Sequence, residues 1–310
     1  MAFEYYITNK RYHTLDYYLK TKYNKKVFKV PLNASFTCPN RDGSKGVGGC
    51  SFCSAMGSGD FAGNPKHSLE QQFNEVISIM KRKWNDAYYI VYFQAFTNTY
   101  GPIEKLKQTF EPFINKKDVI GMSIGTRPDC INEEIVDYLK ELSTNFEEFW
   151  VELGLQTSHN KTAQRINRCY DYDVFEHAVK LLSAANIKVV VHIINGLPNE
   201  SEKMMVQTIK KLNKLPIFGL KIHMLNIIEG TKIAQEYLDK KFHLLTEQEF
   251  IDVTVKQLAH LKGSIIIHRL GGDSDPCKLL APEWILKKMN VVNKIDKKME
   301  DEDVFQGEYF

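Results

Sequence analysis

The sequence has no long apolar run and no leader-like start. No segment of the 310-residue chain reaches the roughly 18 consecutive apolar residues that a membrane-spanning helix needs. The first residues lack the apolar stretch and the small-residue cleavage site of a signal peptide. We therefore expect a cytoplasmic protein without a membrane partner. Thiols stay reduced in that compartment, so the six cysteines predict metal, catalytic or core positions rather than disulfides.

The interior of the sequence also lacks low-complexity linkers and internal repeats. Apolar segments typical of strands alternate instead with stretches typical of amphipathic helices. Strands are predicted at 26–36, 87–96, 118–125, 147–155, 187–195, 218–227 and 263–270. This alternation predicts an α/β fold with a parallel sheet, either a full or partial barrel or a doubly wound open sheet. In each of these folds, functional residues gather at the carboxyl ends of the strands.

The net charge of the chain is small, at +3. Basic residues nevertheless outnumber acidic ones clearly at the start of the chain. There, basic residues alternate with tyrosines. Cations contact phosphates and aromatic rings stack on bases, so this segment is a candidate for binding RNA. The candidate contacts are Lys10, Arg11, Lys22, Lys25 and Lys26. The alternative is an amphipathic helix whose tyrosines pack on the main body.

Three cysteines without an obvious fourth partner follow the first predicted strand. Cys38, Cys50 and Cys53 lie in a glycine-rich loop, and no second C-x-x-C pair occurs. A structural zinc site needs four ligands, for which His67 is the remaining candidate. Three unrelated buried cysteines are a second interpretation. The third is an iron–sulfur cluster with three thiolates instead of the usual four, which leaves one iron open for a substrate or cofactor.

These cysteines resemble those of the radical S-adenosylmethionine (SAM) superfamily. The commonest spacing there is C-x3-C-x2-C, whereas this chain has C-x11-C-x2-C. A wide first gap marks the subgroup that includes the Elongator catalytic subunit and the bacterial YtqA/YhcC-type proteins. The resemblance extends over most of the chain and is greatest to the YtqA type. Its motifs are "FTCPNRDG", "GGCSFC", "YFQAFTNTY", "SIGTRPDC", "VELGLQT", "INRCYDYDVF", "HIINGLP", "LKIHMLN" and "IHRLGGD".

The resemblance implies a partial (β/α)6-type radical SAM barrel over residues 26–270. A basic, tyrosine-rich extension precedes it at 1–25, and a helical extension at 271–310 packs on it. The implied cofactors are a [4Fe–4S] cluster, held by Cys38, Cys50 and Cys53, and SAM, whose amino and carboxylate groups chelate the fourth iron. An external electron donor such as flavodoxin or ferredoxin would trigger SAM cleavage to a 5′-deoxyadenosyl radical.

Polar side chains near the expected strand ends are the other candidates that the resemblance suggests. For SAM binding they are Phe52, Gln94, Thr97, Asn98, Arg127, Glu152, Gln156, Arg168, Asn195 and Gly196. For substrate contact or catalysis they are His192, His223, His268 and Asn226. Arg127 as a helix cap, Glu152 as the partner of a barrel lysine or arginine, and the histidines as core residues are the alternatives. Cys130, Cys169 and Cys277 are more typical of core or rim thiols.

The subgroup resemblance also implies an RNA substrate. Elongator-type enzymes act on the 5-position of tRNA wobble uridine, and YtqA-type proteins are associated with synthesis of its 5-substituent. We expect removal or remodelling of the carboxymethyl group of carboxymethylaminomethyl-uridine, which leaves an aminomethyl group for a separate tRNA methyltransferase. Arg127 or Arg168 would hold the carboxylate. The alternatives are a radical SAM enzyme acting on a small molecule or protein, and a non-catalytic, zinc-stabilised RNA-binding module.

Overall fold

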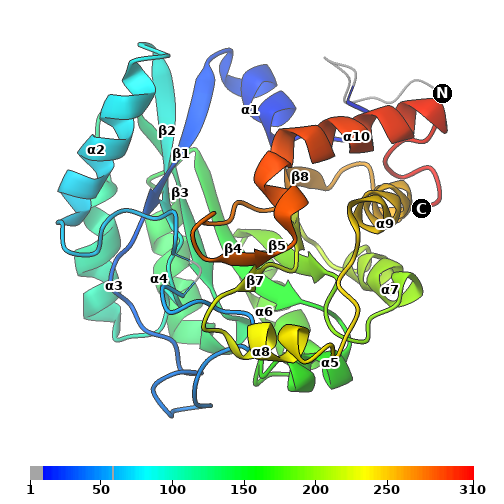
Figure 1. Cartoon of the computed structure of the whole chain (residues 1–310). Helices are drawn as coiled ribbons and strands as arrows, with labels where there is room; N and C mark the ends of the chain where they lie inside the picture. Colours follow the sequence, from blue (N-terminus) through cyan, green and yellow to red (C-terminus); the bar gives the residue numbers. More distant parts are fainter. Residues whose placement is uncertain (1–9, 58) are drawn as a thin grey trace.

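The computed structural model describes residues 10–57 and 59–310, so residues 1–9 of the predicted N-terminal extension lie outside it. Seven parallel strands form one curled sheet in the order β1-β2-β3-β4-β5-β6-β8 (Figure 1). The strands are β1 (Lys26–Leu32), β2 (Ala87–Phe93), β3 (Val119–Thr126), β4 (Glu148–Gln156), β5 (Lys188–Asn195), β6 (Gly219–Met224) and β8 (Ile266–Leu270). Among the described residues the edge strands β1 and β8 do not pair with each other. The predicted partial barrel is therefore confirmed, and the doubly wound sheet is wrong.

Helices alternate with the strands, as right-handed parallel crossovers require. The longer ones are α2 (Leu69–Lys81), α3 (Ile103–Phe110), α4 (Glu133–Ser143), α6 (Tyr172–Ala184), α7 (Glu202–Leu212) and α9 (Glu247–His260). Two of them begin with a reciprocal cap: Ser68 with Gln71 in α2, and Thr246 with Glu249 in α9. In each cap the two side chains accept bonds from amide groups that the first turn leaves free. These caps fix where α2 and α9 begin.

The remaining elements are short, apart from the 14-residue helix α10. They are η1 (Glu111–Phe113), η2 (Pro128–Cys130), α5 (Asn160–Arg165), α8 (Lys232–Leu238), the antiparallel pair β7 (Ile227–Ile228) and β9 (Leu279–Ala281), η3 (Glu283–Lys287) and α10 (Lys288–Asp301). The C-terminal helix α10 packs against α9 (Figure 1). No helix in the described ranges combines the length and the apolar character needed to cross a bilayer.

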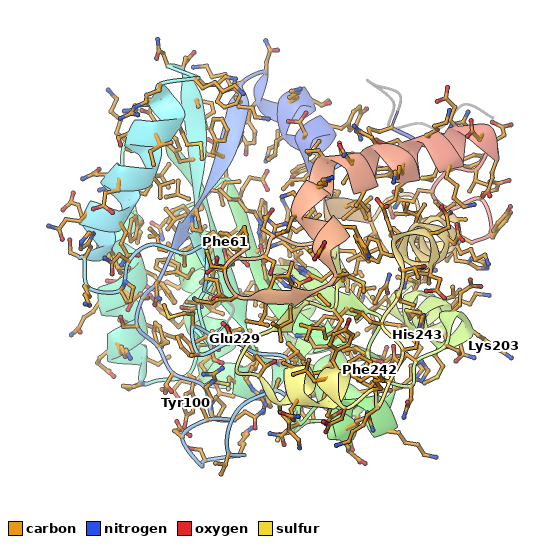
Figure 2. The ribbon with its side chains drawn as sticks, in the orientation of Figure 1. Phe61, Tyr100, Lys203, Glu229, Phe242 and His243 are labelled. Carbon is orange, nitrogen blue, oxygen red and sulfur yellow. The ribbon has the colours of Figure 1, made fainter. Side chains whose placement is uncertain are left out.

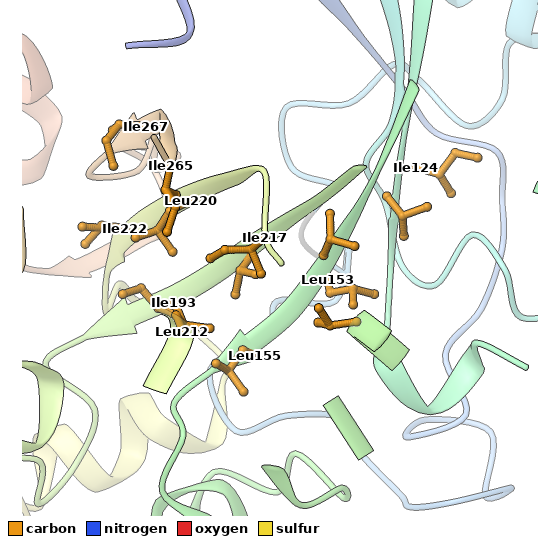
Figure 3. Packing of buried hydrophobic residues seen from close by; sticks show 14 of the residues in the cluster. Ile124, Leu153, Leu155, Ile193, Leu212, Ile217, Leu220, Ile222, Ile265 and Ile267 are labelled. Atoms are coloured by element: carbon orange, nitrogen blue, oxygen red, sulfur yellow. The ribbon is translucent and has the colours of Figure 1, made fainter. Parts of the chain in front are cut away.

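Alternation along each strand divides its side chains between two environments. In β4, Leu153 and Leu155 belong to the main apolar cluster between sheet and helices, which Figure 3 shows together with Ile193, Leu220 and Ile267. The intervening residues of β4 point into the barrel. The outer face therefore provides the core, and the inner face is left for polar chemistry.

Helix α1 (Leu15–Tyr23) lies across the gap between the two edge strands. It contacts both β1 and β8, and Thr14 just before it bridges to Ile267. Its hydroxyl groups on Tyr18 and Tyr23 donate hydrogen bonds to the buried carboxylate of Glu148, at 2.9 and 3.1 Å. The N-terminal helix therefore packs on the N-terminal end of the barrel.

Each predicted RNA-contacting cation pairs with a carboxylate of the chain itself. The pairs are Lys10–Asp296, Arg11–Asp303, Lys22–Glu148, Lys25–Asp86 and Lys26–Asp16. These contacts agree with the alternative interpretation, in which the segment is an amphipathic helix packed on the main body. RNA contact by the segment stays a prediction, because a phosphate would have to compete with these pairs.

Candidate active site

A cavity of about 450 Å³ runs from the carboxyl ends of the strands into the barrel. Its lining includes residues after β1, β2, β3, β4 and β6, as expected for the functional edge of a parallel sheet. Phe61, which is 48% exposed, contributes to its rim and lies near the centre of the face in Figure 2. The cavity therefore brings together side chains that are far apart in the sequence.

The three predicted metal-ligand cysteines all line this cavity. Cys38, Cys50 and Cys53 are free thiols and half-buried, and a turn joins the last two, with the Cys53 amide donating to the Cys50 carbonyl at 3.0 Å. No three His, Cys, Asp or Glu side chains in the described ranges are grouped to hold one metal ion. A four-iron cluster has a different requirement, because each thiolate binds its own iron. Three thiols facing one cavity therefore fit this cofactor.

Burial shapes the chemistry of the central thiol. Burial, with added repulsion from Cys53, raises the pKa of the Cys50 thiol to about 12, while the positive charge of Arg127 acts in the opposite direction. Metal binding needs the thiolate, so a cation must supply the compensating charge. His67, the alternative fourth ligand for zinc, instead pairs with Glu75 at 2.8 Å and does not line the cavity.

The loop that carries the thiols is held by the segment after α5. The Asn167 amide donates to the carbonyls of Gly49 and Val47, at 2.8 and 3.2 Å, and the Ser51 amide donates to the Ile166 carbonyl at 2.9 Å. Asn167 has a φ of 54°, a left-handed conformation that asparagine tolerates. The motif "INRC" therefore holds the cysteine loop in place through hydrogen bonds.

A second contact between these segments is unusually close. The side chain of Asn40 donates to the Cys50 sulfur at 3.6 Å and accepts from the Cys169 thiol at 3.0 Å. A Cβ added to Gly46 would lie 2.2 Å from the Asn40 oxygen and 2.8 Å from the Cys169 sulfur. Only glycine fits there, which accounts for one of the many glycines in the loop.

A buried cluster of charges lies deeper in the same cavity. Glu152 on β4 is fully buried, and its carboxylate accepts hydrogen bonds from Lys29 at 2.5 Å and from Lys221. It also accepts from Ser123 at 2.6 Å, and the His192 ring lies 2.7 Å away. These residues come from β1, β6, β3 and β5. Glu152 therefore pairs with lysines of the barrel interior, which was the alternative to a role in SAM binding.

The charges in this cluster shift one another's titration. Burial alone would raise the pKa of Glu152, but the charges of Lys221 and Lys29 and the bond from His192 hold it well below its usual range. Burial lowers the pKa of Lys221 to about 7, against the opposing effect of Glu152. Burial also lowers the pKa of His192 to about 4. The carboxylate is therefore ionised, and Lys221 titrates near neutral pH.

An aromatic layer separates this cluster from a second buried carboxylate. Trp150 stacks on Phe218 with the ring centres 5.8 Å apart and meets the edge of His268 at 5.3 Å. On the far side, toward α1, Glu148 accepts from Lys22 at 2.6 Å and from Lys188 at 3.0 Å. The inward positions of β4 therefore carry a carboxylate, an aromatic ring and a second carboxylate in succession.

Most of the predicted site residues line the cavity. Besides the cysteines they are Phe52, Gln94, Thr97, Arg127, Glu152, Gln156, His192, His223, His268 and Asn226. Gln156 adopts a φ of 66°, beside a register shift in the pairing of β4 with β5. Their positions agree with the prediction, while their roles toward SAM or substrate stay predictions.

Four predicted SAM-binding residues are not among the residues that line the cavity. The Asn98 amide donates to three backbone carbonyls at 2.8–3.1 Å, and the Arg168 guanidinium donates to the carbonyls of three residues in the 155–170 region. Asn195 exchanges two hydrogen bonds with Gln257, at 2.7 and 2.9 Å, and Gly196 follows it away from the cavity. The geometry gives no support to SAM contacts by these four.

Arg127 pairs with a carboxylate of the chain itself, that of Asp129. Its guanidinium forms two parallel bonds of 2.9 Å with the Asp129 carboxylate and a third to the Arg168 carbonyl. It makes no side-chain cap for η2, the short helix that follows it. A substrate carboxylate would have to displace Asp129.

Sequence reasoning missed the two buried lysines. Lys29 in "VFKVPL" and Lys221 in "GLKIHM" interrupt strands that are otherwise apolar, and both side chains line the cavity with Tyr92 and Arg269. A lysine in the middle of a buried strand is rarely there without a partner. That signal, present in the sequence, points to the barrel interior.

Comparisons with known proteins agree with this arrangement. A family model described as the radical SAM superfamily matches residues 36–212, and a radical SAM C-terminal domain model matches residues 217–301. Protein YtqA of Bacillus subtilis is 44% identical over 308 residues, which cover 99% of this chain and 95% of that protein. A tRNA uridine(34) acetyltransferase of Methanocaldococcus infernus is 30% identical over 142 residues, which cover 44% of this chain and 26% of that protein.

Among solved structures, archaeal Elp3 from Methanocaldococcus infernus superposes with a TM-score of 0.68 at 17% sequence identity. The superposition covers 91% of this chain and 64% of that structure, so this chain spans slightly less than two thirds of its length. At this level of identity the likeness concerns the fold.

Proposed function

The chain belongs to the radical SAM superfamily, whose members use a [4Fe–4S] cluster and SAM, and from this premise we propose that it modifies the 5-substituent of the wobble uridine of tRNA. The family excludes the alternative of a non-catalytic, zinc-stabilised module. The partial sequence match to a tRNA uridine(34) acetyltransferase supports an RNA substrate. The observation that carries the proposal is one cavity with three thiols near its opening and a buried layer of cations deeper in the barrel.

The chain's own residues would divide the work along this cavity. Cys38, Cys50 and Cys53 would hold three irons, and Gln94 and Gln156 lie on the same cavity wall as candidates to orient SAM. When bound, the cluster and SAM supply a 5′-deoxyadenosyl radical that takes a hydrogen atom from the substrate. The protein positions the reacting carbon where this hydrogen atom can be taken.

The reaction we propose converts carboxymethylaminomethyl-uridine to aminomethyl-uridine. Two hydrogens are lost from the N–CH2 unit of the carboxymethyl group, and one water adds to the resulting C=N bond. The C–N bond then breaks, the nitrogen stays on the RNA as an amine, and the two carbons leave as glyoxylate. The two electrons removed equal the two needed to convert SAM into methionine and 5′-deoxyadenosine, with one proton released. A flavodoxin or ferredoxin would start the reaction, and a tRNA methyltransferase would use the product.

The test combines cells and purified protein. In a deletion strain we expect carboxymethylaminomethyl-uridine to accumulate at the wobble position and aminomethyl-uridine to be lost. Anaerobically reconstituted enzyme should form 5′-deoxyadenosine and glyoxylate in equal amounts when the RNA is added, and a Cys50→Ser variant should form neither. Unchanged wobble nucleosides would refute the RNA substrate. 5′-Deoxyadenosine formation that rises with metabolite extract but not with tRNA would favour a small-molecule substrate.

A further inference from the structure

The layer around Glu152 carries more positive than negative charge. Lys29 and Lys221 share one carboxylate, that of Glu152, and the Lys221 side chain is only 8% exposed. Taking a charged group out of water is costly unless an opposite charge compensates it. Glu152 is shared between Lys221 and Lys29, whose side chain is 19% exposed, which leaves room for a second anion.

Near this layer, a second carboxylate is also shared by two cations. Arg269, which lines the cavity, pairs with Asp273 at 2.9 Å, and Lys288 pairs with the same carboxylate. The positive charge of Arg269 contributes to lowering the pKa of Lys221. The side chains of Arg269 and Lys288 are 36% and 32% exposed, so solvent shares in compensating them, and the less compensated cation is the buried Lys221.

Several polar atoms of residues that line the cavity have no hydrogen-bond partner among the described residues. They are Nε2 of His223, Oδ1 of Asn226 and both ring nitrogens of His268. The His223 ring lies against that of His192, with centres 5.1 Å apart, and all of these residues line the cavity. Buried polar groups are normally paired, and a neutral histidine ring can donate from one nitrogen, so the unpaired Nε2 of His223 beside Lys221 indicates a place for an acceptor ligand.

We propose that Lys221 and His223, in the layer around Glu152, bind the carboxylate of the substrate's carboxymethyl group. The inference rests on the proposed function and assigns the carboxylate to this layer instead of to Arg127 or Arg168, whose guanidinium groups are already bonded within the chain.

The depth of the layer suits such a ligand. Glu152 lies four residues before Gln156 along β4, a rise of roughly 13 Å. A carboxylate bound at the level of Glu152 therefore places its own methylene carbon between that layer and the level of Gln156, on the side where the cysteines lie. The bond to be broken then faces the end of the cavity that would hold SAM.

The experiment measures binding, without a reductant, so that no turnover occurs. Cluster-loaded enzyme with SAM is titrated with two anticodon stem-loop RNAs, one carrying carboxymethylaminomethyl-uridine and the other its carboxamide. Because hydrogen bonds to charged groups are the stronger ones, we expect wild type to prefer the carboxylate RNA by about 10- to 100-fold. Lys221→Met should lose this preference because the carboxylate RNA loses more affinity than the carboxamide RNA, and Lys221→Arg should keep most of it.

The matched control is Lys188→Met. Lys188 also lies on a barrel strand and pairs with a buried carboxylate of β4, Glu148, but it does not line the cavity. This variant should keep the wild-type preference, and melting temperatures and iron content will show that all variants are folded and loaded. Equal binding of the two RNAs by wild type, or an unchanged preference in Lys221→Met, would overturn the inference.

A second pair of probes separates this inference from the proposed function. If neither RNA binds, the RNA substrate is refuted, and the enzyme is then tested with N-methylglycine and N-methylglycinamide. Thermal stabilisation by the acid alone, lost in Lys221→Met, would support a carboxylate site for a smaller substrate. Equal stabilisation by both compounds, or by neither, would overturn the site as well.

Discussion

Replacing Glu152 by glutamine tests whether this carboxylate holds the barrel interior together. The substitution keeps the shape of the side chain but removes the charge that compensates Lys29 and Lys221. Breaking a buried ion pair from one side costs about 3–5 kcal/mol, since the remaining charge is left uncompensated. Lys221, with its pKa already lowered to about 7, can lose its proton cheaply, which favours the lower end of this range.

The expected result is a clear loss of thermal stability. A loss of about 3 kcal/mol corresponds to a fall in melting temperature of roughly 5 °C, since the unfolding entropy of a 310-residue chain is about 0.65 kcal/mol/K. The measurement is thermal unfolding under anaerobic conditions at pH 7. Replacing Glu152, Lys29 and Lys221 together by methionine should recover most of the loss, because apolar residues of similar volume often substitute for a buried ion cluster.

The chain offers a matched control for this prediction. Glu148 is equally buried on the same strand, but the side chains of its partners Lys22 and Lys188 are 40% and 35% exposed. Solvent compensates these lysines, so we expect Glu148→Gln to cost only about 1–2 kcal/mol. A Glu152→Gln variant that melts within about 2 °C of wild type, or above Glu148→Gln, would refute the reasoning.

Three further predictions follow from the site and the sheet. Cys50→Ser should lose most of the reconstituted iron, whereas Cys169→Ser should keep it; equal iron content in the two would contradict the ligand assignment. Gly121→Ala would place a Cβ 2.4 Å from a backbone carbonyl of β4 and should destabilise the fold by more than about 2 kcal/mol, whereas Gly101→Ala, with its nearest atom at 3.5 Å, should be close to neutral in thermal unfolding. Lys221 has a folded-state pKa of about 7 against an ordinary 10.5, so its contribution to stability should increase as pH rises from about 7 to 10, and carboxylate binding should weaken over the same range; a flat profile for both would contradict the assignment.

The pH prediction depends on the groups that face Lys221. They are Glu152, His192, Tyr92, Lys29, Arg269, His223 and His268. Glu152 titrates well below neutral pH and His192 near pH 4, so neither changes charge between pH 7 and 10. Burial also lowers the pKa of Lys29, so Lys221→Met should remove most of the dependence on pH in this range, and Lys29→Met should remove less.

The sequence was sufficient to predict the strands and the thiol-bearing loop. Apolar runs such as "IKVVVHIIN" are predicted as buried strands from their own residues, without knowledge of the rest of the fold. Three cysteines in a polar, glycine-rich loop are more typical of a metal centre than of an apolar core. The direction of individual polar side chains depended on tertiary contacts. Asn195 pairs with Gln257, which is 62 residues away, and a register shift near Gly154 decides how Gln156 is placed. Neither is visible in a local pattern.

The partners of the lysines were likewise not predictable from the local sequence. Lys29 lies in the predicted strand 26–36, and its position on β1 turns its side chain inward to Glu152. Lys22, only seven residues earlier, reaches Glu148 from α1 instead. Charge counted along the sequence cannot separate these two, because the sheet curvature decides which carboxylate each one meets.

The aromatic layer at Trp150 lies between two charged clusters on the inner face of β4, one at Glu148 and one at Glu152. Glu148 and its lysines fasten the N-terminal helix to the barrel, and they can do so whatever occupies the other end. On the opposite side of the indole, side chains can be exchanged to suit a different ligand without loosening that fastening. Such an arrangement lets one scaffold acquire new substrates through a handful of inward positions, while the remainder of the strand goes on folding unchanged.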